Sequence, residues 1–389
     1  MSNRTRITPS APVADEPRTP RQTRKKKKKG GVGRFVRRLL LVIFTLVLLL
    51  AGGLYMILNT VFNGPSEAAR NVLTMSLSEA SATKWVPGLF IGDELVEEIR
   101  NKSGAALEEA YSDASQVVIN KDNALSASDE WKDYPDGIRI LEYQGDTYNA
   151  HIMIIRNPEQ VYMATSTDGP FSMDVPGTRI NHEIETEGAI AAINAGAFND
   201  DGSANAYVGS IPAGLLMVNG EVRSNTLHER VPEQGFAGFT FDNILVVAKS
   251  MTAEQAKELN IRDGCEFGPV LIMNGEVNQE AYNANSGYNP RTAIGQRADG
   301  AVIFLCIDGR QASSLGGTYR DIIDIMVEYG AVNACNMDGG SSSVMLYRDV
   351  YGIYGEPGQV QMINSYSLLQ AEPRRMPNFW MVRPAEEEG

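Results

Sequence analysis

The chain has 389 residues, 43% hydrophobic content and a net charge of −13, which is ordinary for a globular protein of one or two domains. Residues 1–38 carry 13 Lys and Arg against two acids, whereas the remainder has 22 basic and 46 acidic residues, a net charge of −24. So acidic a body excludes a nucleic-acid-binding domain, because phosphate backbones require a basic protein face.

The N-terminal segment predicts a membrane anchor. Residues 1–33 are rich in Pro, Ser, Thr, Arg and Lys and are interpreted as a disordered basic cytoplasmic tail. Residues 39–58 are uncharged and long enough to span a bilayer, and Arg34, Arg37 and Arg38 precede them, so the positive-inside rule places the C-terminal domain outside the cell. We therefore expect a single-pass signal anchor over residues 34–60 in the cell membrane; a cleavable signal peptide, the alternative, has a shorter apolar core and a small-residue cleavage site.

Residues 61–135 are expected to form a membrane-proximal region. Leu73, Leu77 and Ala80 recur at helical spacing, as do apolar residues between positions 95 and 107. Residues 112–135 are polar and charged, which predicts a linker. The globular domain is therefore placed at residues 136–382, followed by a polar tail over residues 383–389.

The domain alternates strand and helix patterns, which predicts an α+β fold with a mixed sheet and flanking helices. Hairpins are expected over residues 138–156 and 235–249, a helix capped by Thr252 over residues 252–260, and a closing strand over residues 364–370.

The most informative stretch lies between residues 288 and 347. Residues 301–307 form an apolar run that ends at Asp308-Gly309, and residues 331–337 form a second run that ends at Asp338-Gly339-Gly340. A helix between them begins at Thr318, with Asp321 completing a capping box. If the two strands are parallel, both aspartates lie at one sheet edge, where α/β sheets bind ligands. The alternative is that each Asp-Gly pair is an ordinary turn.

Arg291 begins this stretch and offers a planar, permanently charged fork for phosphate or carboxylate. Glycines in the turns can leave backbone N–H groups free to face an anion. The three cysteines do not form a disulfide scaffold; Cys306 and Cys335 are expected to be buried thiols on neighbouring strands. Three isolated histidines do not indicate a zinc site.

These motifs in order resemble the phosphodiester glycosidase family, which includes the uncovering enzyme for N-acetylglucosamine phosphodiesters and bacterial exopolysaccharide-associated proteins. The resemblance extends over about residues 135–370 and rests on GAIAAINAGAFN, NPRTAIG, IDGR and NACNMDGGSSS. Residues 211–222 and 268–277 resemble two glycine-containing hairpins of the family, so the resemblance implies a hairpin at each. One departure is Gln361, which stands where an arginine is expected before the last strand, so one anion contact is missing there.

The resemblance implies a glycosidase that hydrolyses the C1–O bond of a sugar-1-phosphodiester in cell-envelope or exopolysaccharide metabolism, with a phosphorylated glycan as substrate. Asp308 and Asp338 are then candidate nucleophile and general base, and Arg291 stabilises the phosphate. The expected substrate-binding residues are Asn194, Gly196, Asn199, Thr292, Arg310, Gly339, Gly340 and Ser341.

Two other functions stay open at this point. One is a non-catalytic envelope module that binds phosphorylated glycan, and the other is a metal-dependent phosphodiesterase. No cofactor is expected, although carboxylates beside a phosphate would suit a divalent cation such as Ca²⁺ or Mg²⁺.

Overall fold

The computed structural model describes residues 31–78, 83–100, 110–119, 131–199, 208–226, 235–366 and 372–385. The chain divides into two units, Met1–Leu58 and Asn59–Gly389. Helix α1 (Gly31–Phe62) contains a 28-residue apolar stretch, Phe35–Phe62, that is long and apolar enough to cross a membrane, a property that signal sequences share. Most of the predicted cytoplasmic tail, residues 1–30, lies outside the described residues.

Three short helices follow, as predicted for the membrane-proximal region: α2 (Glu67–Ser78), α3 (Val86–Ile91) and α4 (Asp93–Arg100). Phe62 is buried and stacks on Phe90 of α3, with ring centroids 5.0 Å apart. The backbone N–H of Tyr288 donates to Ser76 Oγ at 2.8 Å, which joins α2 to the loop that precedes β15.

Part of the predicted linker packs against the domain instead. Tyr111 forms a β-bridge with Ala248, and the N–H of the buried Ser112 donates to Val247 at 2.9 Å. These residues cover a sheet edge whose backbone groups would otherwise lack partners. A short 3-10 helix, η1 (Ala114–Gln116), follows, and residues 120–130 lie outside the described part of the chain.

Three sheets build the domain, and every strand pairing among the described residues is antiparallel. The fold class is α+β as predicted, although the sheets are not mixed. The seven-stranded sheet contains, in spatial order, β1 (Ile138–Gln144), β2 (Asn149–Ile155), β16 (Val302–Ile307), β15 (Arg291–Arg297), β17 (Ala331–Met337), β13 (Val270–Met273) and β14 (Glu276–Val277).

Two five-stranded sheets complete the domain. One contains β11 (Leu245–Ala248), β10 (Phe236–Thr240), β12 (Ile261–Glu266), β8 (Gly214–Val218) and β9 (Glu221–Thr226). The other contains β19 (Val360–Met362), β18 (Met345–Arg348), β5 (Ala191–Asn194), β21 (Asn378–Val382) and β3 (Val161–Thr165). Two small ribbons pair β20 (Arg375–Met376) with β4 (Thr178–Arg179) and β6 (Phe198–Asn199) with β7 (Ile211–Pro212).

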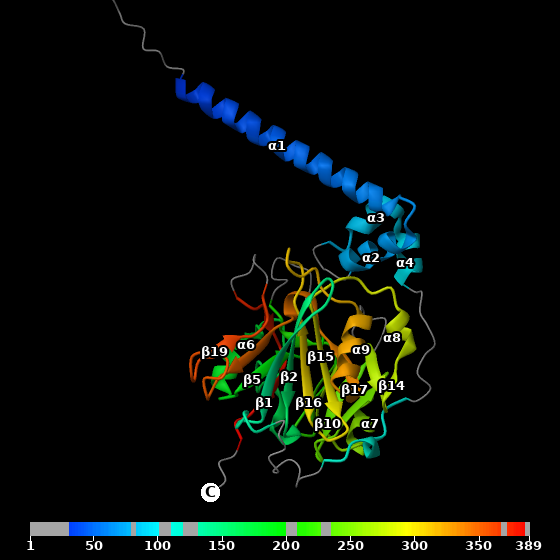
Figure 1. The fold of residues 1–389 in the computed structure, drawn as a ribbon, viewed down its shortest axis with the longest axis vertical. Helices are drawn as coiled ribbons and strands as arrows, with labels where there is room; N and C mark the ends of the chain where they lie inside the picture. Colours follow the sequence, from blue (N-terminus) through cyan, green and yellow to red (C-terminus); the bar gives the residue numbers. More distant parts are fainter. Residues whose placement is uncertain are drawn as a thin grey trace, which may run out of the picture. The chain divides into compact units, whose positions relative to one another are not determined.

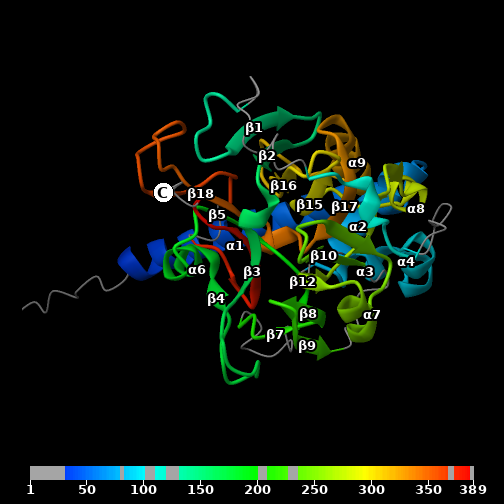
Figure 2. The ribbon, with the colours of Figure 1, turned by 90° about the horizontal axis from the view of Figure 1, so that it is seen from below.

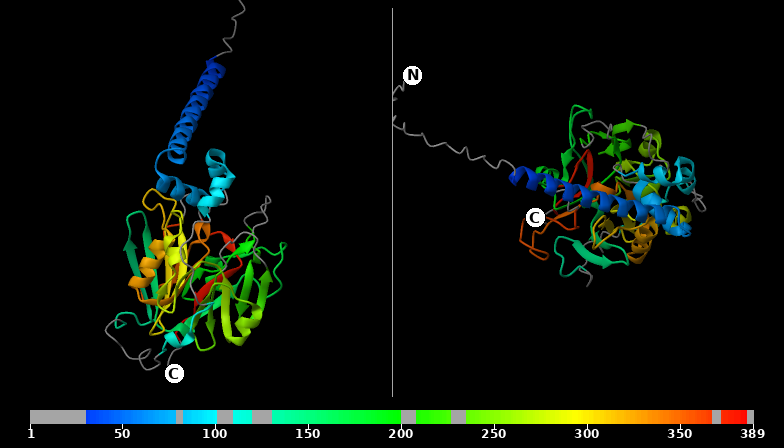
Figure 3. Two further views of the ribbon diagram at one scale, coloured as in Figure 1. Left: turned by 90° about the vertical axis from the view of Figure 1, so that its right-hand side faces the viewer. Right: turned by 90° about the horizontal axis from the view of Figure 1, so that it is seen from above.

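The main core lies where the three sheets face one another (Figure 2). Met153, Phe304 and Ile294 enter it from the seven-stranded sheet, and Phe239 and Trp380 meet edge to face from the other two. Helices cover the outer faces (Figures 1 and 3). They are α8 (Gln279–Asn283) and α9 (Tyr319–Glu328) on the seven-stranded sheet, and α6 (Ile180–Thr186) and α7 (Ala253–Glu258) on the five-stranded sheets.

The strand–helix–strand unit predicted around the two Asp-Gly turns is present, with one change. Strands β16 and β17 run in the same direction, but β15 lies between them and is antiparallel to both. The Thr318–Asp321 capping box begins α9, and the Thr252–Gln255 box begins α7. Because β15 lies between β16 and β17, these two strands do not form the direct parallel pairing that a crossover usually makes.

All four predicted hairpins form, but the closing strand is misplaced. It is β21 at residues 378–382 rather than residues 364–370, of which residues 364–366 are not in a strand and the others lie outside the described ones. All five β21 residues are buried, so this strand lacks the polar alternation that marks a surface strand.

Cys265, Cys306 and Cys335 are free, buried thiols. Cys306 and Cys335 do not lie on neighbouring strands, because β15 separates β16 from β17. Burial raises the pKa of each thiol well above its ordinary value, since a thiolate would lose its hydration.

We predict that a water-soluble disulfide reagent at pH 8 labels none of the three native thiols and labels all three in guanidinium chloride. Reactivity needs exposed thiolate, and the native fold supplies neither exposure nor ionisation. A Glu254→Cys variant, with its thiol on the exposed face of α7, is the positive control. Rapid labelling of a native core thiol would contradict the described packing.

Candidate active site

Three predicted site residues lie at the same end of three adjacent strands of the seven-stranded sheet. Asp308 follows the last residue of β16, Asp338 follows the last residue of β17, and Arg291 begins β15 between them. Arg291 pairs with Ile307, and Thr292 pairs with both Cys306 and Met337. The two aspartates are separated by two strand spacings, roughly 10 Å.

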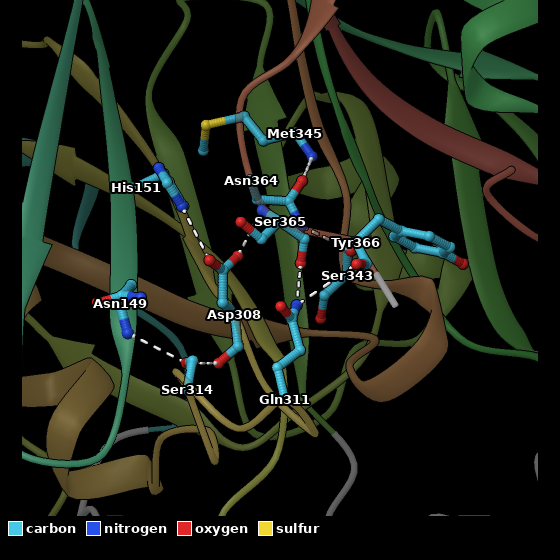
Figure 4. Close-up of polar contacts among 10 residues, drawn as sticks. All are labelled: Asn149, His151, Asp308, Gln311, Ser314, Ser343, Met345, Asn364, Ser365 and Tyr366. Carbon is cyan, nitrogen blue, oxygen red and sulfur yellow. Dashed lines mark hydrogen bonds and ion pairs between the residues drawn. The ribbon is translucent and has the colours of Figure 1, made fainter. Parts of the chain in front are cut away.

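Asp308 is 2% exposed and is held from two directions (Figure 4). One carboxylate oxygen lies 3.3 Å from His151 Nε2 on β2, and the other accepts the backbone N–H of Ser365 at 2.9 Å. His151 lies on the side of β16 opposite β15 and β17. Asp308 therefore joins β2, β16 and the segment that carries Ser365.

The loop after β16 is tied to the same segment. Ser314 Oγ donates to the backbone carbonyl of Asp308 at 2.8 Å and accepts the N–H of Asn149 at 3.1 Å. Gln311 Nε2 donates to the carbonyl of Ser365 at 2.6 Å (Figure 4). Asn364 accepts the N–H of Met345 at 2.8 Å, so the network reaches β18. Sequence reasoning missed these partners because they come from four separate segments.

Arg291 is 5% exposed, and its guanidinium is directed into the protein. Nε donates to the carbonyl of Gly317 at 3.1 Å, Nη2 donates to the carbonyl of Gly287 at 2.8 Å, and the plane lies 4.6 Å from the Tyr319 ring centroid. Backbone carbonyls and an aromatic face satisfy this buried cation. The arrangement fixes the loops on either side of β15.

Asn194 and Thr292 are fully buried and contact each other. Thr292 Oγ1 donates to Asn194 Oδ1 at 2.8 Å, and the N–H of Val344 donates to the same oxygen at 3.2 Å. Asn194 Nδ2 donates to the backbone carbonyl of Asp338 at 2.6 Å. These hydrogen bonds therefore hold the turn that begins at Asp338 in position.

The backbone N–H groups expected to be free for an anion are occupied. Gly196 donates to Asn378 Oδ1 at 2.7 Å, Gly339 to Asp338 Oδ1 at 2.9 Å and Gly340 to the Pro290 carbonyl at 2.8 Å. The expectation of an anion-binding nest at these glycines is wrong, because the turn closes on its own carboxylate and on the loop before β15. Gly340 has φ = +64°, which glycine adopts without strain.

Arg310 and the half-buried Asp338 lie on adjoining turns. A Cβ on Gly340 would lie 3.2 Å from Arg310 Nη1 and Nη2, so the guanidinium covers this glycine directly. Arg310 is exposed, has φ = +58° and donates to Asn289 Oδ1 at 3.0 Å. Ser341 follows in the short 3-10 helix η3 (Gly340–Ser342).

A second arginine reaches the same turn from the far end of the chain. Arg374 Nη1 donates to Ser341 Oγ at 3.4 Å, and its guanidinium lies 4.6 Å from the ring centroid of Phe198, next to Asn199. Tyr366 donates to the Ser341 carbonyl at 2.5 Å. Burial raises the pKa of Tyr366; Arg374 lowers it and Asp338 raises it, so both charges act on this phenol.

Arg374, and not residue 361, is the arginine that precedes the last strands of the chain. Gln361 lies in β19, and its side chain packs against Gly355. Arg374 immediately precedes β20 and β21, the true closing strands, so the arginine before the last strand exists 13 residues further along. The misplaced closing strand is the reason that sequence reasoning missed it.

Glu266 is another carboxyl group near this end of the sheets. Its backbone carbonyl accepts the N–H of Ala197 at 3.2 Å, while Ala195 accepts the N–H of Asp338 at 3.0 Å. Burial raises the pKa of Glu266, and a hydrogen bond from the Leu215 N–H offsets part of that rise. The turn at residues 195–197 is thus bonded to the backbone of Glu266 on one side and to the backbone of Asp338 on the other.

Within the described residues, no group of three or more His, Cys, Asp and Glu is arranged to hold a metal ion. A surface hollow of about 590 Å³ contains none of the predicted site residues; it is lined by Ala114, Ser115, Val117, Val118, Ile119, Asp242 and Ile244. It borders the segment whose Val118 bonds to Ala298, just beyond the end of β15 opposite Arg291. The site described above is therefore distinct from this hollow.

The family model for phosphodiester glycosidases matches residues 187–383, which are 197 residues and just over half of the chain. The chain belongs to the phosphodiester glycosidase family. All the predicted site residues, together with Glu266 and Arg374, lie inside the matched range, whereas His151 lies outside it.

Individual relatives are more distant. The SPbeta prophage-derived protein YomE of Bacillus subtilis strain 168 is 34% identical over 85 residues, which cover 21% of this chain and 13% of that protein. The zebrafish N-acetylglucosamine-1-phosphodiester α-N-acetylglucosaminidase catalytic domain, solved auto-inhibited by its pro-peptide, is 17% identical with a TM-score of 0.47, over 64% of this chain and 82% of that one. A hypothetical protein from Synechocystis is 15% identical with a TM-score of 0.41, over 63% of this chain and 61% of that one.

We predict that Arg291→Ala destabilises this phosphodiester glycosidase domain by about 3 kcal/mol, because two buried carbonyls lose a charged donor and a cavity opens beside Tyr319. Arg291→Lys should recover only part of the loss, since an ammonium cannot reproduce the planar fork. Urea unfolding followed by fluorescence measures both. The control is Arg320→Ala, which removes an arginine stacked on Tyr282; an equal loss in both variants would refute a special role for Arg291.

Proposed function

We propose that the protein is an extracytoplasmic, membrane-anchored glycosidase that hydrolyses a sugar-1-phosphodiester in cell-envelope or exopolysaccharide metabolism. Water adds at C1 of the sugar, the C1–O bond breaks and a phosphate monoester leaves. Membership of the phosphodiester glycosidase family supports the reaction class. The apolar helix α1 with arginines on its N-terminal side supports the anchor and its direction.

The observation that carries this proposal is the convergence of opposite charges on the turn after β17. Asp338 begins this turn, Arg310 lies over Gly340, and Arg374 contacts Ser341. Cleavage of a glycosyl phosphate needs an anionic group near the oxocarbenium-like sugar and cationic groups near the departing phosphate. The carboxylate of Asp338 supplies the anionic group, and the guanidiniums of Arg310 and Arg374, which contact the same turn, supply the cationic groups.

We assign the roles as follows. Asp338 is the catalytic carboxylate, acting as nucleophile or general base. Arg310 and Arg374 receive the phosphate, and Gly339, Gly340, Ser341 and Asn199 line the site. Asp308, Arg291, Asn194, Thr292 and Gly196 hold the loops in position.

We predict that Asp338→Asn abolishes hydrolysis of a sugar-1-phosphodiester panel, while the exposed Asp242→Asn retains it. Hydrolysis by the wild-type chain in ¹⁸O-labelled water should place the label in the sugar, because the C1–O bond breaks. Mass spectrometry of the products reads this directly. Label in the phosphate would indicate a phosphodiesterase instead, and binding without turnover would indicate a glycan-binding module.

Removal of one guanidinium should affect charged and neutral leaving groups differently. Arg374→Ala should lower kcat on a glycosyl phosphodiester by on the order of a hundredfold, as for loss of one donor to a developing anion. Turnover of an uncharged aryl glycoside should change far less. Arg375→Ala is the matched control, since this neighbouring arginine donates to the Gly177 carbonyl instead. Equal losses on both substrates would show that Arg374 does not bind the phosphate.

A further inference from the structure

Two large apolar side chains are exposed on one face of α3. Trp85, the N-cap residue, is 61% exposed, and Leu89, four residues later, is 71% exposed. Trp85 has helical dihedral angles, so the two side chains lie on the same face of one turn. Residues 84–91 carry one positive charge, Lys84, and no negative charge. Together they form a small apolar surface, which we call the α3 face.

The chain connects the α3 face directly to the end of the apolar helix. Phe90, on the same helix, stacks on Phe62 at 5.0 Å, and Phe62 is the last residue of α1. The span predicted from the sequence, residues 39–58, ends four residues earlier, which is at most about 14 Å of extended chain. If that segment spans a bilayer, Phe62 and Phe90 lie within reach of the headgroup layer.

The composition of the α3 face suits that layer. Tryptophan and other amphipathic side chains concentrate at membrane interfaces, where the indole ring is buried among acyl chains and its N–H remains near water. Burial of a leucine side chain among acyl chains adds a further favourable contribution. The acidic α4, which follows immediately, opposes adsorption to anionic lipid, so the attraction is apolar rather than electrostatic.

We propose that the α3 face inserts into the outer-leaflet interface of the bilayer beside the anchor. The proposal rests on the anchoring part of the proposed function and not on the hydrolytic reaction. The occupant is lipid: the anchor brings the α3 face to the headgroup layer at high effective concentration, whereas a second copy would have to diffuse to it. The protein would then have two membrane contacts, one spanning helix and one interfacial turn.

The three tryptophans make this measurable without a label. Trp131 is 7% exposed and Trp380 is fully buried, so Trp85 alone is exposed among them. Full-length protein is reconstituted into phosphatidylcholine vesicles with bromine at shallow or deep acyl positions. Trp85 emission should be quenched, more strongly by shallow bromines, and the quenching should persist in high salt. Trp85→Phe should remove the quenched component and leave the emission of the two buried tryptophans.

Leu89→Asp should abolish the quenching, because a carboxylate at this position opposes insertion. Val327→Asp, the same change at an exposed valine of α9, should leave it unchanged. Both variants should protect their core thiols and hydrolyse soluble phosphodiester as the wild type does. Red-shifted, unquenched Trp85 emission in anchored protein would overturn the proposal, and blue-shifted but unquenched emission would indicate a protein partner and overturn it equally.

Failure of the anchor gives a different result. If alkaline carbonate releases the full-length chain from vesicles, the spanning helix is refuted and the α3 proposal falls with it. Retention after carbonate without quenching refutes the α3 proposal alone.

Discussion

A fully buried amide joins two of the sheets at the edge that carries the candidate site. Asn194 ends β5 of a five-stranded sheet, and its oxygen accepts the hydroxyl of Thr292 on the seven-stranded sheet. Its nitrogen donates to the carbonyl of Asp338. An amide enclosed between sheets must have its hydrogen bonds made within the protein, because no water reaches it and an unmade bond costs about 1–3 kcal/mol. The position of the Asp338 turn follows from that constraint.

The charged residues around Asn194 fall into two groups, one buried and one at least partly exposed. Arg291 and Asp308 are enclosed and bonded to carbonyls, an imidazole and a backbone N–H, so they hold loops together. Arg310 is exposed, and Arg374 and Asp338 are half-buried, so they can meet a ligand. Enclosed ions lose hydration and need fixed partners, whereas partly exposed ions can exchange water for substrate. The same chemical groups therefore serve two purposes within a few residues of each other.

Local signals predicted the local structure well. The N-cap at Thr252, the capping box at Thr318, the hairpin turns and the apolar runs ending at Asp308 and Asp338 all appear where expected. The insertion of β15 between β16 and β17 could not be predicted, since pairing depends on sequence-distant strands and no short-range pattern records it. Arg374 was missed for the same reason: 33 residues separate it from Ser341, and the closing strand that delivers it is uniformly apolar.

The hydrogen bond between Ser76 and Tyr288 has a consequence for how substrate is found. Two residues beyond Tyr288, the carbonyl of Pro290 accepts the N–H of Gly340, so α2 is joined through one short loop to the turn that carries the candidate site. If the protein is the membrane-anchored enzyme proposed above, it searches a surface layer and not a volume. Substrates fixed to the same membrane or wall would be encountered at a high effective concentration set by that connection, and freely diffusing ones would gain nothing from it.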